Sequence, residues 1–170
     1  MCKLQKEEHR IFRKRMIECI LATDMTNHFK VLATLKSKVE SINKQTSESI
    51  ITSNINKAEN AILKFDIQQD ILNFLIHTAD ISNPAKEFVI CKQWANLCME
   101  EFFQQGDLEK AESLPVSFLC DRETVNIPKA QIGFTKGIVS PIINLLVDII
   151  PELTYFQKNI DKNIEEWENY

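Results

Sequence analysis

Glycine is scarce in this sequence: 3 of 170 residues, where average usage would give about twelve. Strands joined by tight turns need glycine at positions with positive φ, so this scarcity favours helices. The apolar residues recur at intervals of three and four, as in Phe29, Leu32, Leu35, Val39 and Ile42. That spacing is typical of one face of an amphipathic helix. We therefore predict an all-α fold, a compact multi-helix domain.

The same periodicity predicts six helical segments. Asn126 is a candidate N-cap and Pro128 a first-turn proline for the fifth of them, and the residue before Pro84 should end the third. Pro141 should kink the fifth. The segments are Leu4–Ile20, Phe29–Ile42, a third that starts at Lys57 or Asp66 and ends at Ala79, Phe88–Gln105, 127–150 and Pro151–Trp167.

The connections are predicted from composition. Ser41–Asn56 is rich in Ser, Thr, Asn and Gln and is expected to be a loop. Gly106 is expected to stop the fourth helix, and Asp107–Val125 to be a long irregular connection. Gly133 and Gly137, four residues apart, would allow another element to approach closely. No internal repeat or second domain is indicated.

Charge and hydropathy limit the partners. The net charge is −4, and the basic group Arg10, Arg13, Lys14 and Arg15 falls within an apolar helical pattern. A solvated helix face is therefore favoured over a nucleic-acid surface. The most apolar run, Ile138–Ile150, is interrupted by polar residues and proline, so no membrane span is expected.

The five cysteines are an odd number without a C-x-x-C pair. The segment Met1–Arg15 is charged throughout and does not resemble a signal peptide. These features predict reduced thiols and an intracellular, cytoplasmic location.

His77, Asp80 and Asn83 are spaced three apart at the end of an apolar helix. An imidazole and a carboxylate on one helix face could bind a divalent metal. Polar residues closing a helix C-terminus explain the same pattern, and spacing alone favours that interpretation. One His and one Asp fall short of the three or four protein ligands of a zinc site. His28 is expected to lie at the surface or to cap a helix, and His9 to be exposed.

Two aromatic groupings are candidates for ligand contact. The Gln131 amide can donate and accept, so it could recognise a purine edge, and Phe134 nearby could stack on that purine. A solvated Gln beside a core Phe explains the same two residues, and composition alone strongly favours that interpretation. The apolar face of the fourth helix is more typical of core than of a ligand pocket. That face is formed by Trp94, Leu97, Cys98, Phe102 and Phe103.

A series of segments nevertheless resembles, in order, the catalytic domain of the class I 3′,5′-cyclic nucleotide phosphodiesterases. His77-Thr-Ala-Asp-Ile-Ser-Asn-Pro84 resembles the metal-aspartate motif of that family. The other segments are Leu21-Ala-Thr-Asp-Met25 with His28, Trp94 with Glu100–Asp107, Leu114-Pro115, Cys120-Asp-Arg122 and Ala130-Gln-Ile-Gly-Phe134. The resemblance covers Leu4–Trp167, almost the whole chain.

The resemblance implies a role for each matching residue. Asp80 would be a direct metal ligand, Gln131 would hydrogen-bond the purine, and Phe134 would stack on it. Cys98 stands where the family has an apolar residue on the opposite purine face. Asn83 would lie near the base edge, and Met25, Leu119 and Phe102 would line the pocket. Asp24 and His28 would lie near the metal-side wall, with Trp94 at the pocket floor.

The sequence departs from the family pattern in its length and histidines. Family catalytic domains are about twice as long, and their N-terminal half carries H-N-x-x-H, whose first His protonates the departing 3′ oxygen, and H-D-x-x-H, which supplies metal ligands. Neither motif occurs here. The resemblance therefore implies that residues 1–170 are the C-terminal portion of a single phosphodiesterase catalytic domain, truncated on its N-terminal side, with no catalytic residue in this chain.

The implied function is hydrolysis of cAMP, cGMP or both to the 5′-monophosphate in signal transduction. It would use two divalent metal ions, zinc and magnesium or manganese, at a site that this chain leaves incomplete. The alternative is a non-catalytic helical module that binds a nucleotide or a partner. An incomplete domain should expose apolar surface, so we expect self-association and consider an oligomer possible. Membrane tethering could reside in other regions.

Overall fold

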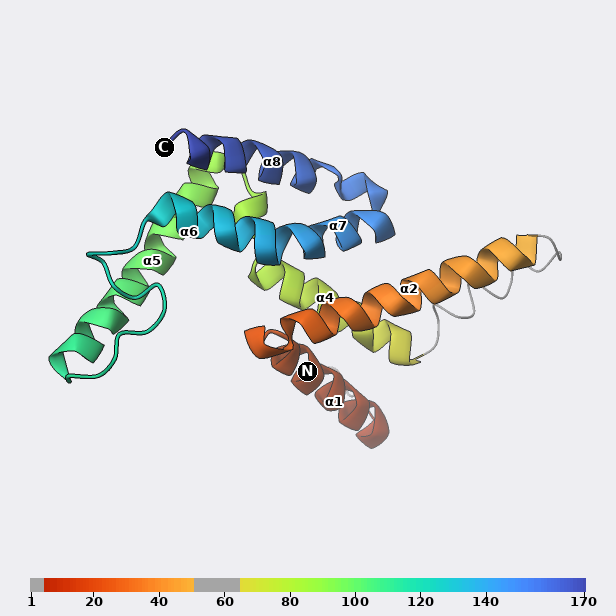
Figure 1. The fold of residues 1–170 in the computed structure, drawn as a ribbon. Coiled ribbons are helices and arrows are strands. Elements are labelled where there is room, and N and C mark those ends of the chain that lie inside the picture. Colours follow the sequence, from red (N-terminus) through yellow and green to blue (C-terminus); the bar gives the residue numbers. More distant parts are fainter. Residues whose placement is uncertain (1–4, 51–64) are drawn as a thin grey trace. The chain divides into compact units, whose positions relative to one another are not determined.

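The computed structural model describes residues 5–50 and 65–170, with side chains for 5–41 and 67–170. Throughout these residues the regular elements are helices, which confirms the all-α prediction. The contacts divide the chain into two compact units, unit 1 at Met1–Asp80 and unit 2 at Ile81–Tyr170. Figure 1 shows the order of the helices along the chain.

Unit 1 is built on helix α4 (Phe65–Asp80), which packs against both α1 (Lys6–Ala22) and α2 (His28–Ile50). Its apolar core includes Ala22, Leu35 and Phe74. The gap between the first two predicted helices contains a short 3₁₀ turn, η1 (Met25–Asn27). The Asp24 carboxylate caps this turn by accepting from the backbone N–H of Thr26 at 2.8 Å.

The predicted loop at Ser41–Asn56 is wrong for residues 41–50, because α2 continues to Ile50. Residues 51–56 lie outside the described residues, as does the alternative helix start at Lys57. Ser, Thr, Asn and Gln each disfavour a helix by only a few tenths of a kcal/mol, up to about 0.7. Without Gly or Pro, a run of such residues therefore does not end a helix.

Unit 2 is assembled around helix α8 (Tyr155–Glu168), whose buried residues include Ile160 and Trp167. It packs against α5 (Phe88–Ala111), α6 (Ile127–Phe134) and α7 (Ser140–Ile149). It also contacts two short turns, η2 (Asn83–Ala85) and η4 (Pro151–Leu153). One helix therefore holds together most of the elements of this unit.

The start and the interior of the 127–149 helix follow local chemistry. The Asn126 side chain accepts from the backbone N–H of Lys129 at 2.9 Å, and Pro128 lies in the first turn, as predicted. Proline at 141 cannot donate to the carbonyl of residue 137. A π-helical stretch, η3 (Thr135–Val139), accordingly lies just before Pro141.

By length and composition alone, Ile127–Ile149 could cross a membrane. The core helix of a soluble domain meets the same criterion, so the finding is weak evidence. Part of the helix is buried in unit 2, including the polar Gln131 and Thr135. The expectation that this chain has no membrane span stays a prediction.

Helix α5 corrects two predictions. It continues past Gly106 to Ala111, so Gly106 does not stop it. Its buried side is formed by Cys91, Ala95, Met99, Phe103 and Gly106. Of the face that was expected to be core, Phe103 alone is buried, while the remaining four residues, Trp94, Leu97, Cys98 and Phe102, are exposed.

The glycines at 133 and 137 were predicted to allow a close approach, and this is wrong. Apart from the helix's own backbone, a Cβ at either position would meet no atom of the described residues within 4 Å. Gly106 is instead the glycine against which another segment packs, because its Cα faces the backbone carbonyl of Cys120. Spacing alone cannot distinguish these cases.

Helix α1 carries an exposed apolar stripe, from which we predict self-association. Phe12, Met16 and Ile20 are spaced four apart on one helix face, and Phe12 and Ile20 are 54% and 64% exposed. Apolar surface of this kind favours association with other apolar surface. Sedimentation velocity of the purified chain should show mass increasing with concentration. The double variant Phe12→Glu/Ile20→Glu should shift the chain toward monomer.

Arg13→Glu is the matched control, because Arg13 is an exposed polar position on the same helix. It should leave the association unchanged. A wild-type chain that sediments as a monomer at every concentration would contradict the prediction.

Candidate functional site

The two polar residues at the end of α4 face different surroundings. His77 is fully buried, whereas Asp80, three residues later and the last residue of the helix, is exposed. His77 Nε2 lies 2.8 Å from Nδ1 of His28. The spacing that suggested a metal-binding pair therefore places one side chain inside unit 1 and leaves the other accessible.

His28 also is fully buried, so the prediction of a surface position is wrong, whereas the predicted capping position is present, because its backbone N–H donates to the Met25 carbonyl at the end of η1. The Phe29 ring packs edge-on against its imidazole, with centroids 4.8 Å apart. Burial lowers the pKa of both histidines; the neighbouring His77 lowers that of His28 further, while Asp80 partly offsets the effect at His77. Both rings are therefore held neutral.

The sequence did contain a signal for this pair. His28 precedes Leu32 by four and Leu35 by seven residues, which places it on the buried stripe of α2. His77 follows the buried Phe74 by three residues on α4. Extending the apolar periodicity through the polar residues would have placed both imidazoles in the interior.

The described residues do not complete a metal site. No group of three His, Cys, Asp or Glu side chains in that part of the chain could hold a metal ion. Asp80 offers a single accessible carboxylate, and His77 Nε2 is already bonded to His28. One carboxylate fits the role of one ligand and falls short of the number that a divalent metal needs.

Two other predicted residues of unit 1 flank the η1 turn. Met25 is exposed at its start. The Asp24 carboxylate accepts from both the backbone and the hydroxyl of Thr26, each at 2.8 Å. The hydrogen bond from the Thr26 backbone is the main cause that lowers the pKa of Asp24. Asp24 thus acts as a structural cap in this unit.

In unit 2, Gln131 is only 7% exposed. Its amide nevertheless makes no hydrogen bond to any other described residue. The amide atoms are not among the fully buried atoms that lack a partner, so they reach the surface, where a ligand or water can bond to them. Phe134 is half-buried at the end of the same helix, where the π-helical stretch begins.

Asn83 is half-buried at the start of η2 and is held through α8. The buried Asn163 donates from Nδ2 to the carbonyls of Pro84 and Lys86, at 2.8 and 2.7 Å. Asn159 donates to the carbonyl of Ala85 at 2.9 Å. The three consecutive carbonyls that follow Asn83 are therefore held by amides of α8, a contribution that the sequence did not indicate.

The other predicted pocket residues of unit 2 are accessible. Cys98 and Phe102 are exposed on one face of α5, four residues apart, with Trp94 one turn earlier. Leu119 is half-buried in the connection between α5 and α6 and has a φ of 64°. No hydrogen bond or ring contact joins the predicted pocket residues within the described ranges.

The predicted site residues are thus distributed over both units. Met25 and Asp80 belong to unit 1, and the other six belong to unit 2. Within unit 2, α8 packs against α5, α6 and η2, which carry five of those six. The arrangement gives unit 2 an accessible aromatic face and an unpaired amide, which suit a flat heteroaromatic ligand.

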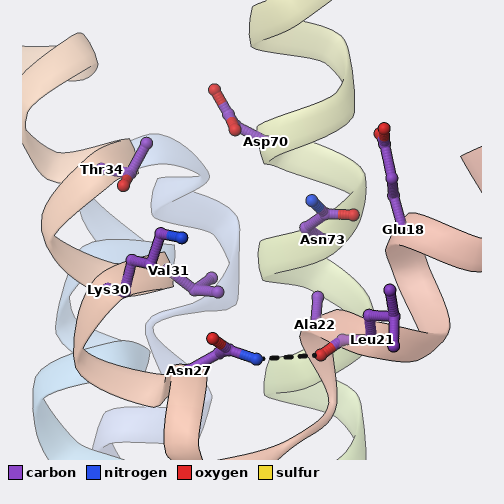
Figure 2. A pocket seen from close by; sticks show the side chains of 9 residues that line it. All are labelled: Glu18, Leu21, Ala22, Asn27, Lys30, Val31, Thr34, Asp70 and Asn73. Atoms are coloured by element: carbon purple, nitrogen blue, oxygen red, sulfur yellow. Dashed lines mark hydrogen bonds between the residues drawn. The ribbon is translucent and has the colours of Figure 1, made fainter.

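A separate pocket of about 320 Å³ lies within unit 1, among α1, η1, α2 and α4. Its side chains are mixed in character and contain none of the predicted site residues (Figure 2). The two carboxylates, Glu18 and Asp70, are paired with Lys14 and Lys38. The remaining lining residues are Leu21, Ala22, Asn27, Lys30, Val31, Thr34 and Asn73.

Comparison with known proteins bears on the kind of heteroaromatic ligand that the residues of unit 2 would bind. The profile of the family described as 3′5′-cyclic nucleotide phosphodiesterase matches residues 1–160. The chain is 32% identical over 169 residues to a 3′,5′-cyclic-AMP phosphodiesterase, isoform F, of Drosophila melanogaster. It is 34% identical over 168 residues to a probable 3′,5′-cyclic-AMP phosphodiesterase of Caenorhabditis elegans. These matches cover 99% and 98% of the chain and 24% and 23% of the relatives.

A solved structure matches equally well. The phosphodiesterase domain of a RhoPDE fusion protein from the choanoflagellate Salpingoeca rosetta superposes with a TM-score of 0.78 at 32% identity. The match covers 99% of this chain and 49% of that domain. The chain therefore spans about a quarter of these curated relatives and about half of the solved domain.

Proposed function

Since the chain belongs to the 3′5′-cyclic nucleotide phosphodiesterase family, we propose that it carries the nucleotide-binding portion of an enzyme that hydrolyses cAMP, cGMP or both to the 5′-monophosphate. In that reaction, water adds to phosphorus and the bond to the 3′ oxygen breaks. Residues 1–170 would be the C-terminal portion of one catalytic domain. The relatives named as cAMP phosphodiesterases favour cAMP as the substrate to test first.

The observation that carries the proposal is the amide of Gln131. The side chain is 7% exposed, its amide reaches the surface and lacks a partner among the described residues, and it can present a donor and an acceptor to a purine edge. We propose that Phe134 stacks on the purine and Cys98 covers its other face. Asn83 would lie at the base edge, and Phe102, Leu119 and Met25 would line the pocket.

We further propose that Asp80 supplies one ligand to the metal ions on which the family depends. Its carboxylate is accessible at the end of α4. When bound, such ions would stabilise charge on the phosphate and activate water. The remaining ligands and the general acid would come from the family's N-terminal histidine motifs, which this sequence lacks. We also propose that the protein is located inside the cell.

We expect the purified 170-residue chain to bind cyclic nucleotide without hydrolysing it. The Gln131 amide and the Phe134 ring would retain affinity, but no histidine is positioned in an H-N-x-x-H or H-D-x-x-H motif. Binding can be measured by ligand-observed NMR, and turnover by release of 5′-monophosphate with Zn²⁺ and Mg²⁺ present. Gln131→Ala should weaken cAMP binding about tenfold, the value of one well-made hydrogen bond.

Gln104→Ala is the matched control, because Gln104 is exposed on α5 and bonds to Glu100. It should leave the affinity unchanged. Turnover of cAMP or cGMP by the chain, abolished by Asp80→Ala, would contradict the prediction of inactivity. Equal affinities for wild type and Gln131→Ala would contradict the proposed role of the amide.

The second candidate function is a non-catalytic module that keeps the nucleotide pocket. The lack of a three-ligand group in the described part of the chain favours it. The two functions differ in what lies upstream of Met1 in the gene. In-frame H-N-x-x-H and H-D-x-x-H motifs in the transcript would support the enzyme, and a transcript that starts at Met1 would support the module.

A further inference from the structure

Leu119 has a backbone conformation that leucine rarely adopts. Its φ of 64° lies in the left-handed region, where Cβ crowds the following carbonyl oxygen. Ser113, at φ 57°, is the other non-glycine residue of this kind in the described chain, and it lies just after the end of α5, where the left-handed conformation is common. Leu119 lies at no helix end; it is the third residue of a β-turn that the Cys120 N–H closes on the Ser117 carbonyl at 3.0 Å, a position that favours glycine, so the contacts that hold the two ends of this turn maintain its conformation.

The chain is anchored to α5 two residues before Leu119. The Glu109 carboxylate accepts from both the backbone N–H and the hydroxyl of Ser117, each at 2.6 Å. Hydrogen bonds from Ser117 are the largest cause of the lowered pKa of Glu109, so this acceptor stays ionised at neutral pH.

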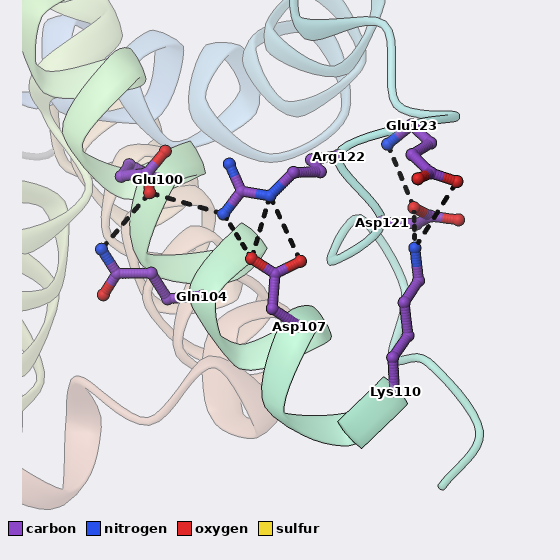
Figure 3. Close-up of polar contacts among 7 residues, drawn as sticks. All are labelled: Glu100, Gln104, Asp107, Lys110, Asp121, Arg122 and Glu123. Carbon is purple, nitrogen blue, oxygen red and sulfur yellow. Dashed lines mark hydrogen bonds and ion pairs between the residues drawn. The ribbon is translucent and has the colours of Figure 1, made fainter. Parts of the chain in front are cut away.

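The chain is anchored again on each of the three residues that follow Leu119. The Cys120 carbonyl packs against the Cα of Gly106. Asp121 pairs with Lys110 at 2.7 Å. Arg122 binds the Asp107 carboxylate through two nitrogens, Nε and Nη2, at 3.0 and 2.6 Å from Oδ2 (Figure 3).

Arg122 makes the most constrained of these contacts. Its Nη2 also lies 3.5 Å from Oε1 of Glu100, and its guanidinium lies over the Phe103 ring, 5.3 Å from the centroid. A simple exposed ion pair contributes little to stability. A guanidinium held by two carboxylates and an aromatic ring has a fixed orientation. It therefore also fixes the direction of the backbone between Leu119 and Arg122.

We propose that Arg122 is a positioning residue. Paired with Asp107, it holds Leu119 in the left-handed conformation and thereby fixes the Leu119 side chain as one wall of the nucleotide pocket. The second statement rests on the proposed function. Leu119 would contact the apolar surface of the purine or ribose, so a looser Leu119 weakens nucleotide binding without removing any polar contact to the ligand.

The test compares the full 170-residue chain with its Arg122→Gln variant. Gln removes the charge and the fork but keeps most of the side chain. Amide hydrogen exchange of residues 117–122 should become about tenfold faster, while exchange in α8 stays unchanged. Affinity for cAMP, measured by NMR titration, should fall about fivefold. Arg122→Lys, which keeps the charge, should restore part of both.

Lys136→Gln is the matched control. It breaks an exposed ion pair with Glu168, 3.2 Å long, that does not involve residues 112–126. It should change neither the exchange of residues 117–122 nor the affinity. Equal exchange in wild type and Arg122→Gln would overturn the proposal.

Faster exchange with unchanged cAMP affinity would overturn the role of Arg122 in the pocket. A wild-type chain that binds neither cAMP nor cGMP would overturn the pocket role together with the proposed function. In that case the exchange measurement alone decides whether Arg122 holds Leu119.

Discussion

Gly106→Ala is expected to lower the free energy of unfolding by about 3 kcal/mol, the upper range for inserting one methyl group into packed surroundings. A Cβ at this position would lie 1.9 Å from the carbonyl oxygen of Cys120 and 2.7 Å from its carbonyl carbon. Both are backbone atoms, so no side-chain rotation can relieve the overlap. The connection at 117–122 would have to move away from α5, together with Leu119.

Gly133→Ala is the matched control for this substitution. Gly133 also lies within a helix, but a Cβ there meets no atom within 4 Å. Replacing an exposed helical glycine by alanine should raise stability by about 0.5–1 kcal/mol. Urea unfolding followed by circular dichroism measures both variants. Gly106→Ala unfolding at the same urea concentration as Gly133→Ala would contradict the contact with Cys120.

Gly106 illustrates a limit of prediction from sequence. A glycine after a run of apolar helical residues predicts a C-terminal stop, because glycine is common just past helix ends. The same residue is needed wherever a second segment touches the helix backbone. The segment that touches Gly106 begins more than ten residues later in the sequence, and no local pattern identifies it. The helix therefore continues for six residues beyond the predicted end.

Signals that depend on neighbouring residues were more reliable. The cap at Asn126 and the first-turn Pro128 were predicted because their effect involves the three or four residues that follow. The buried side of α5 was predicted wrongly. When bulky residues lie on both sides of a helix, the elements that pack against it determine which side is buried. Small residues, Cys91 and Ala95, face the interior, and Trp94 and Leu97 face outward.

For the candidate site, the sequence identified residues and the structure supplied their support. The resemblance selected Asn83 and Gln131, but it gave no reason for either to be held in place. Asn163 donates to the carbonyl of Pro84, inside the turn that begins at Asn83, and to that of Lys86, directly after it. Such support comes from a helix some eighty residues away, which only the folded chain brings into contact.

His28→Ala is expected to lower the free energy of unfolding by about 3 kcal/mol, as the sum of a cavity and a lost buried hydrogen bond. The His28 ring fills the space between α2 and α4 and is fully buried. Its removal leaves Nε2 of His77 without its partner. His9→Ala, at an exposed position of α1, is the control and should leave stability unchanged.

The pair also predicts how stability depends on pH. Whichever ring donates, the outer nitrogens, Nε2 of His28 and Nδ1 of His77, are buried without a hydrogen-bond partner among the described residues. A proton added to either ring would therefore find no hydrogen-bond partner among the described residues, and burial lowers the pKa of both rings in the folded chain. In the unfolded chain the histidines take up protons below about pH 6.5.

Below that pH the unfolded chain binds more protons than the folded chain, so the free energy of unfolding decreases as the pH is lowered. The decrease is at most about 1.4 kcal/mol per pH unit for each histidine, and above about pH 6.5 the pair causes no loss of stability. Asp80 favours the charged form of His77 and so partly offsets the effect of burial on that ring. Urea unfolding at pH 7.5 and 5.5 measures the loss. The double variant His28→Leu/His77→Leu removes both buried imidazoles, so most of the loss should disappear with it, while His9→Ala keeps the whole of it. An unchanged pH dependence in the double variant would show that other groups cause it, and the neutral pair would then have no part in the acid sensitivity of unit 1.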